Sequence, residues 1–164
     1  MGSEHTTDIK DSRLPKGAVL KFTRGIGKKI KRGPMFYKDH PSEKIGWRTE
    51  GYLKSDVVIE IVCRGHVIAG LAYDFRGSKN GAVIESHGTY VARRRRGQGL
   101  GTVLWDTAIK QEAAVRVEMQ VISDLGMTLV NSLEKKFPEI GWAVSEGGRR
   151  DLRKLKKKTA RRRT

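Results

Sequence analysis

The chain has 164 residues, enough for one domain with a hydrophobic core. Its 34 lysine and arginine residues outnumber 18 acidic residues, and the net charge of +16 favours a polyanionic partner such as DNA, RNA or an acidic protein. The single cysteine, Cys63, excludes an internal disulfide and a thiolate metal cluster. No apolar run reaches the roughly 20 residues of a membrane span. We therefore expect an intracellular, cytoplasmic domain with no metal and no membrane partner.

The N-terminal third has the weakest patterns. Residues 1–15 are polar, and we expect a disordered leader there. Residues 17–23 alternate well enough for a first strand. Residues 24–56 are rich in glycine and lysine and contain Pro34 and Pro41, which predicts loops with one or two short helical turns.

Regular patterns fill the rest of the domain, which we place at residues 16–147. Alternating apolar residues indicate strands, and apolar residues at helical spacing indicate helices. The predicted strands span residues 57–63, 66–75, 82–91, 115–121 and 142–145, and the predicted helices span 100–113 and 124–136. This order predicts an α+β fold: a mixed, mostly antiparallel sheet with flanking helices and one strand–helix–strand crossover that creates a parallel pair.

A basic tail follows at residues 148–164. Such a block is either disordered or a helix that forms on a polyanion. It contains no aromatic residue for stacking on bases, so we expect contacts with phosphates rather than base reading. The candidate contacts are Arg149, Arg150, Arg153, Lys154, Lys156, Lys157, Lys158, Arg161, Arg162 and Arg163.

The segment after the strand at 82–91 has the features of an anion cradle. Gly97, Gly99 and Gly101 alternate just before a helix, where glycines let the backbone approach a phosphate and the first amides of the helix point at it. Four arginines, residues 93–96, add positive charge. The P-loop pattern needs a lysine at the start of the helix, and Gly99-Leu100-Gly101-Thr102 has none. The dinucleotide-binding fingerprint is also excluded, because it needs its third glycine where Thr102 stands.

The run Arg96-Gly97-Gln98-Gly99-Leu100-Gly101 instead matches Arg/Gln-x-x-Gly-x-Gly/Ala, the signature of GNAT N-acetyltransferases. With the order of elements around it, the chain resembles that superfamily over about residues 57–137. The resemblance implies acetyl-CoA as the cosubstrate, with its pyrophosphate on the amides of the glycine turn and its pantetheine arm along the preceding strand, which a bulge splays. The implied cofactor-binding residues are Tyr90, Val91, Ala92, Arg96, Gly97, Gln98, Gly99, Leu100, Gly101 and Thr102.

The resemblance also implies catalytic roles. The amide of Val91 would stabilise the oxyanion, and Glu85 matches the strand glutamate that serves as base in the histone-modifying branch. A half-buried carboxylate suits that role near neutral pH, whereas a surface glutamate paired with an arginine would have none. His87, two residues further along the same strand face, is a second candidate.

Two departures from the family stand out. The tyrosine that reprotonates the CoA thiolate in many relatives is replaced by Val130 or Asn131, with Tyr73 and Tyr90 as possible substitutes. The pattern of residues 24–56 is poorly helical, whereas in the family this part usually supplies two helices that wall the acceptor groove, so the resemblance does not carry over the acceptor specificity.

Three functions remain open. The first is an acetyltransferase for a protein amine, docked by its basic ends (Lys28, Lys29, Lys31 and Arg32 at the N-terminal side) on nucleic acid or an acidic assembly. The second is a non-catalytic nucleic-acid-binding module, and the third is a partner-blocking protein in which CoA binding is vestigial. An aminoglycoside acceptor is disfavoured because a polycation needs an acidic groove.

Overall fold

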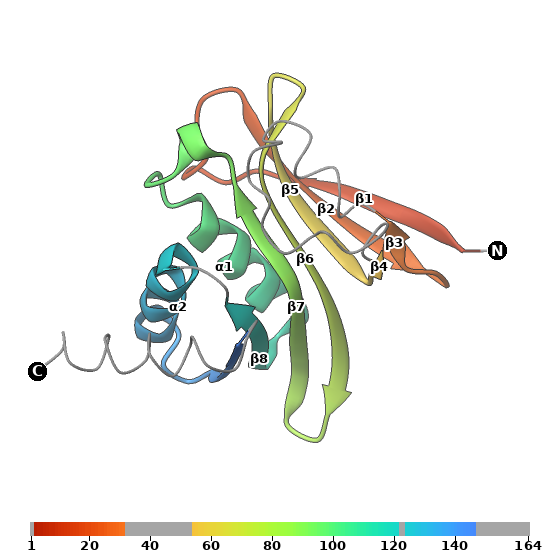
Figure 1. Cartoon of the computed structure of the whole chain (residues 1–164). Coiled ribbons are helices and arrows are strands. Elements are labelled where there is room, and N and C mark those ends of the chain that lie inside the picture. Colours follow the sequence, from red (N-terminus) through yellow and green to blue (C-terminus); the bar gives the residue numbers. More distant parts are fainter. Residues whose placement is uncertain (1, 32–53, 122–123, 147–164) are drawn as a thin grey trace, which may run out of the picture.

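The computed structural model describes residues 2–31, 54–121 and 124–146 (Figure 1). Within them lie a seven-stranded sheet in the order β1-β2-β5-β6-β7-β8-β9 and a separate two-stranded sheet, β3-β4. The strands are β1 (Ser3–Ile9), β2 (Ala18–Ile26), β3 (Ile30–Lys31), β4 (Lys54–Ser55), β5 (Val57–Cys63), β6 (His66–Ser78), β7 (Gly81–Val91), β8 (Ala114–Val121) and β9 (Gly141–Glu146). The helices are α1 (Leu100–Glu112) and α2 (Asp124–Lys136), with a short 3-10 turn, η2, at Arg93–Arg95.

The predicted α+β fold is confirmed. Neighbouring strands from β1 to β7 pair antiparallel, and the crossover through α1 places β8 parallel to β7, as the sequence predicts. β9 also pairs in parallel with β8. β6 is longer than predicted and ends at Ser78, because the β6–β7 ladder continues to the pair Ser78–Gly81. The Ser78 hydroxyl donates to the carbonyl of Gly81 at 2.6 Å and closes this tight turn.

The predicted disordered leader is wrong for residues 3–9. These residues form β1, which pairs with β2 along its whole length. Most β1 side chains are exposed, so polarity alone misled the prediction: an edge strand needs backbone hydrogen bonds on one side and no buried face. Its β-branched residues favour an extended chain, and the hydroxyls of Thr6 and Thr23 lie 3.0 Å apart across the pair.

The loops predicted for residues 24–56 are tested only in part. β2 extends to Ile26, and β3 and β4 pair at Ile30–Lys31 and Lys54–Ser55. The predicted helical turns, Pro34, Pro41 and Arg32 lie outside the described residues.

Both helices pack on one face of the large sheet and enclose the main core (Figure 1). Since strand side chains alternate between faces, the opposite face carries a second, smaller cluster of Ile30, Val58, Ala72 and Tyr90. The largest fully buried side chains of the main core are Trp105, Tyr73, Leu20, Ile59, Ile61, Leu71, Ile84, Leu100, Leu104 and Leu133.

Candidate active site

The large sheet changes its pairing between β7 and β8. The two strands pair in parallel from Ala82 to Glu85 of β7, and their ladder in the described residues ends there. β7 continues to Val91 beside β6, and β8 continues to Val121 beside β9. Among the described strands, none pairs with the β7 edge that faces away from β6 from residue 86 to 91, and we call this stretch the open edge of β7.

A β-bulge lies within the same stretch. The β6–β7 register pairs Tyr73 with Ser86 and Ala72 with Gly88, so His87 is the extra residue of β7. A bulge bends its strand and resets which face each later side chain occupies. The family resemblance implies that a bulge splays this strand, and the structure has a bulge in it at His87.

Beyond the bulge, the side chains of Thr89 and Tyr90 lie on opposite faces of the sheet and both make contacts there. The hydroxyl of Thr89 accepts a hydrogen bond from Nε1 of the fully buried Trp105 in α1 at 3.0 Å. Tyr90 points to the other face, where it belongs to the smaller core cluster and is 4% exposed.

The backbone of Val91 points to the open edge. The next amide, that of Ala92, donates to the carbonyl of Ile68 in β6 at 2.7 Å. Successive amides of an extended strand point to opposite edges, so the Val91 amide faces away from β6. Its carbonyl accepts a hydrogen bond from Nε of Arg96 at 3.0 Å, which ties the arginine turn to the strand.

The glycine turn leads into α1 with an open approach. Gly97 and Gly99 have φ angles of +80° and +77°, a region that side-chain-bearing residues rarely adopt. A Cβ at either glycine would meet no atom of the described residues within 4 Å. Gly99 is also the N-cap of α1 and provides no side-chain cap for the first helical amides. These amides and the positive end of the helix dipole therefore form a site suited to an anion.

Gly101 has a different role from the other two glycines. A Cβ at this position would lie 3.2 Å from a terminal methyl of Leu129 in α2. Gly101 therefore permits the close packing of α1 against α2. The side chain of Leu100 is buried in the core, whereas Gln98 is exposed and Thr102 half-buried.

Positive charge surrounds the turn. Arg93, Arg94 and Arg96 are exposed, and Arg95 is half-buried with its guanidinium 3.9 Å from the sulfur of Cys63. The segment from residue 92 to residue 102 contains no acidic residue. An anionic ligand at the glycine turn would thus meet arginines on the same turn.

Glu85 does not have the half-buried setting expected of a base. Its side chain is 57% exposed, and its carboxylate lies 4.0 Å from the guanidinium of Arg76. Arg76 also binds Glu118 of β8 at 2.8 Å. This geometry matches the alternative of a surface glutamate beside an arginine, and the role of Glu85 stays a prediction.

His87 lies in a more defined environment. Its Nε2 is 3.0 Å from Oδ2 of Asp74 in β6, and the two side chains are 23% and 18% exposed. The same carboxylate oxygen accepts a hydrogen bond from Nζ of Lys29 at 2.7 Å. Burial raises the pKa of Asp74, but the hydrogen bond from Lys29 and the nearby His87 ring outweigh it and hold that pKa below its ordinary value. Asp74 is absent from the sequence-based candidates because only the strand register places it beside His87.

The two tyrosine substitutes differ in position. The Tyr73 hydroxyl donates a hydrogen bond at 3.1 Å to the carboxylate of Glu112, the last residue of α1. Burial is the main cause that raises the pKa of Tyr73 above its ordinary range, and the negative charge of Glu112 adds to it. The 13 residues of α1 span about 20 Å, which separates Tyr73 from the glycine turn. Tyr90 follows Thr89 on β7 and is the nearer of the two.

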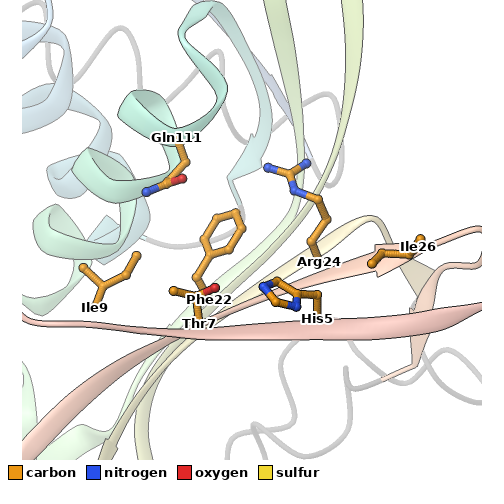
Figure 2. A pocket seen from close by; sticks show the side chains of 7 residues that line it. All are labelled: His5, Thr7, Ile9, Phe22, Arg24, Ile26 and Gln111. Carbon is orange, nitrogen blue, oxygen red and sulfur yellow. The ribbon is translucent and has the colours of Figure 1, made fainter.

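A pocket of about 300 Å³ lies near the C-terminal end of α1, between that helix and strands β1 and β2 (Figure 2). None of the predicted site residues lines it. Its walls are His5, Thr7, Ile9, Phe22, Arg24, Ile26 and Gln111.

The predicted polyanion contacts at residues 149–163 lie outside the described residues. Among the residues that the structure does describe, no helix is long and apolar enough to cross a membrane. No group of three or more metal-ligating side chains occurs in that same part of the chain.

Comparison with known proteins agrees with the geometry. The model of the acetyltransferase (GNAT) family matches residues 28–130, well over half of the sequence, and the chain belongs to this family and has its fold. A possible acetyltransferase from Clostridium difficile 630, known from its crystal structure, is 14% identical with a TM-score of 0.33. That match covers 64% of this chain and 57% of the other, so the chain spans little more than half of that protein. No curated protein matches the sequence.

Proposed function

We propose that the protein transfers an acetyl group from acetyl-CoA to an amine of a protein. The observation that carries the proposal is the position of the open edge of β7 next to the uncapped N-terminus of α1. An exposed strand edge offers backbone hydrogen bonds to an amide-bearing arm, and a helix N-terminus offers amides to phosphate. Membership of the acetyltransferase family supports acetyl transfer in general.

The residues of the turn fit a CoA pyrophosphate. Gly97 and Gly99 leave open the space that a side chain would fill, so phosphate oxygens can approach the backbone. The amides of residues 97–102 would hold the pyrophosphate, and the neighbouring arginines would offset its charge. The pantetheine arm would follow residues 90–92 along the open edge. Acetyl-CoA supplies an acetyl group that is already activated as a thioester.

The Val91 amide is suited to stabilise the oxygen that becomes negative during transfer, because it points along the open edge. The amine attacks the acetyl carbon, the carbon–sulfur bond breaks, and one proton must leave the amine. A thiol with an ordinary pKa near 8.5 is a fair leaving group, so the tyrosine replaced here by Val130 or Asn131 is not essential.

The charge of the chain supports a polyanionic neighbour. A net charge of +16 exceeds what a small-molecule acetyltransferase needs, and the ten basic residues of the tail favour docking on nucleic acid or an acidic assembly. The acceptor would then be a lysine or an N-terminus of a protein in that assembly. Polycationic small molecules remain disfavoured on the same electrostatic grounds.

Calorimetric titration with acetyl-CoA, NADH, ATP and a short DNA duplex at about 150 mM salt tests the proposal. We expect acetyl-CoA to bind most tightly, and Gly99→Glu to weaken it at least about tenfold, because the new carboxylate fills and repels the phosphate site. Gly65→Glu is the matched control, since Gly65 also has a positive φ of +80° and open space around it.

Two outcomes separate the proposal from its main alternative. Loss of acetyl-CoA binding in the Gly99 variant, with the Gly65 variant unchanged, supports the cosubstrate site. If the wild-type protein binds DNA in a salt-sensitive manner but not acetyl-CoA, and Gly99→Glu abolishes DNA binding, the turn is a phosphate clamp without catalysis.

A further inference from the structure

We propose that the outer edge of β1, which faces away from β2, is a dimer interface on which β1 of a second copy of this chain pairs antiparallel around Thr7. Such pairing is independent of the proposed acetyl transfer. It follows from the position of β1 at the edge of the large sheet, from the sequence of this strand and from the pocket that borders it.

β1 lacks features that usually keep an edge strand from pairing. Natural edge strands are often very short, interrupted by a bulge, or protected by proline or lysine. β1 has seven residues, and its register with β2 runs from Ser3 to Ile9 without a shift. Its sequence, SEHTTDI, contains neither proline nor lysine. Among the described strands only β2 pairs with β1, so the outer edge can accept another strand.

Symmetry limits how two copies of β1 can pair. A two-fold axis perpendicular to the sheet keeps each face of the sheet on the same side in both copies. Residues that lie opposite each other share a face, and successive side chains of a strand alternate between the faces. Odd-numbered residues must therefore oppose odd-numbered residues, and even-numbered residues must oppose even-numbered ones. The axis then passes between two copies of the same residue.

Charge selects the register centred on Thr7, because opposite charges stabilise a strand pair and like charges destabilise it. A register centred on Thr6 would place Glu4 opposite Asp8 twice. One centred on Asp8 would place its two copies together. The register centred on Thr7 instead places Glu4 opposite Lys10, the exposed residue that follows β1, at both ends of the pair. It also places Thr6 opposite Asp8, where a hydroxyl can donate to a carboxylate.

The edge strand is acidic in a basic chain. Residues 3–11 carry three acidic side chains, Glu4, Asp8 and Asp11, and one lysine, whereas the whole chain has a net charge of +16. Each acidic strand would therefore approach a partner that is positive overall. This arrangement reduces the repulsion that two copies of so basic a chain would otherwise meet.

The pocket beside β1 adds an apolar contact to the strand pair. Its wall includes His5, Thr7 and Ile9, the odd-numbered residues of β1, together with Phe22 and Ile26 of β2 (Figure 2). Ile26 is 52% exposed in the single chain. In the register centred on Thr7, His5 of the second copy lies opposite Ile9. The two pockets then meet across the axis, and each histidine ring covers apolar surface of the other copy.

The interface leaves the candidate active site open. The pocket lies near the C-terminal end of α1, and the glycine turn precedes the N-terminal end, about 20 Å away along a helix of 13 residues. Variants that separate the two copies should therefore leave the affinity for acetyl-CoA within about twofold, which also shows that they are folded.

The first experiment is sedimentation velocity of the full chain from about 1 to about 100 μM at about 150 mM salt, where we expect a concentration-dependent dimer. Glu4→Lys and Lys10→Glu each turn two attractive pairs into repulsive ones, so each should raise the dissociation constant about tenfold or more. The double variant exchanges the charges across each pair and should return to within about threefold of wild type. Glu139→Lys, the same change at an exposed position after α2, is the control.

Disulfide crosslinking tests the register itself. Thr7→Cys would place two thiols opposite each other across the axis, at a Cα separation of about 5 Å that a disulfide can span. His5→Cys would place them four residues apart along the strands, about 13 Å, which is too far. We expect an intermolecular crosslink in Thr7→Cys and none in His5→Cys. The native Cys63 is buried and should not compete.

Three results would overturn the interface. The first is a chain that stays monomeric up to about 100 μM, above all if a lysine-rich peptide then slows amide exchange in β1, because the edge would accept a foreign strand instead. The second is a dimer that neither charge variant weakens. The third is a crosslink in His5→Cys or Thr6→Cys but not in Thr7→Cys, which would assign a different register.

Discussion

The two ends of α1 use charge in opposite ways. At the C-terminal end, the Glu112 side chain is 4% exposed, pairs with Arg24 at 2.5 Å and accepts a hydrogen bond from Tyr73. At the N-terminal end, arginines are exposed, the N-cap is a glycine, and no side chain in the described part of the chain caps the first helical amides. Removing one partner of a buried ion pair destabilises the fold, whereas an uncapped helix end beside exposed charges is available to a ligand.

The largest expected effect on stability belongs to the C-terminal end. Glu112→Ala removes the partner of Arg24 and of the buried Tyr73 hydroxyl, so we expect the free energy of unfolding to fall by about 3 kcal/mol. The affinity for acetyl-CoA should stay within about twofold, which urea unfolding and calorimetry together would test. Equal losses of stability in Glu112→Ala and in the exposed control Glu139→Ala would contradict the contrast between the two ends.

A smaller effect is expected where the N-terminal end packs on α2. Gly101→Val should cost about 2 kcal/mol, because its side chain must displace the Leu129 methyls. The double variant Gly101→Val with Leu129→Ala should lose less stability than the sum of the two single changes. Additive losses in a thermal melt would show that the two side chains do not meet.

The smallest effect concerns the segment between β1 and β2, which an ion pair ties to the middle of α1. Arg13 joins Asp11 at 2.7 Å to Asp106 of α1 at 2.8 Å, and its hydrogen bond is the main cause that lowers the pKa of Asp11 to about 2. Because this pKa lies below its unfolded value, the stabilisation is present above about pH 4 and is lost as pH falls towards 2. With Arg13 partly exposed, Asp11→Asn should cost about 1 kcal/mol at pH 7, and most of that cost should be gone at about pH 2. A pH-independent difference in unfolding free energy would mean that the ion pair is not the cause.

The sequence could predict the central fold but not the surroundings of His87. The apolar runs from Val57 to Lys136 are long and regular, so their element types follow from periodicity. The bulge at His87 follows from a one-residue shift in register, which leaves no signature in the pattern. The partnership with Asp74 depends on that shift, and β1 has no apolar face by which periodicity could reveal it.

The short ladder between β7 and β8 has a mechanical consequence. In the described residues, pairing over Ala82–Glu85 is the strand contact that joins the antiparallel part of the sheet, β1 to β7, to the parallel pair β8 and β9. So short a ladder leaves the rest of β7 and β8, as far as the structure describes them, without ladder hydrogen bonds to each other. A ligand arm bonded along the rest of β7 would act as a brace that lengthens the joint. Slower amide hydrogen exchange in β8 and β9 would then accompany binding, because the arm would join β8 to β7 beyond their short ladder.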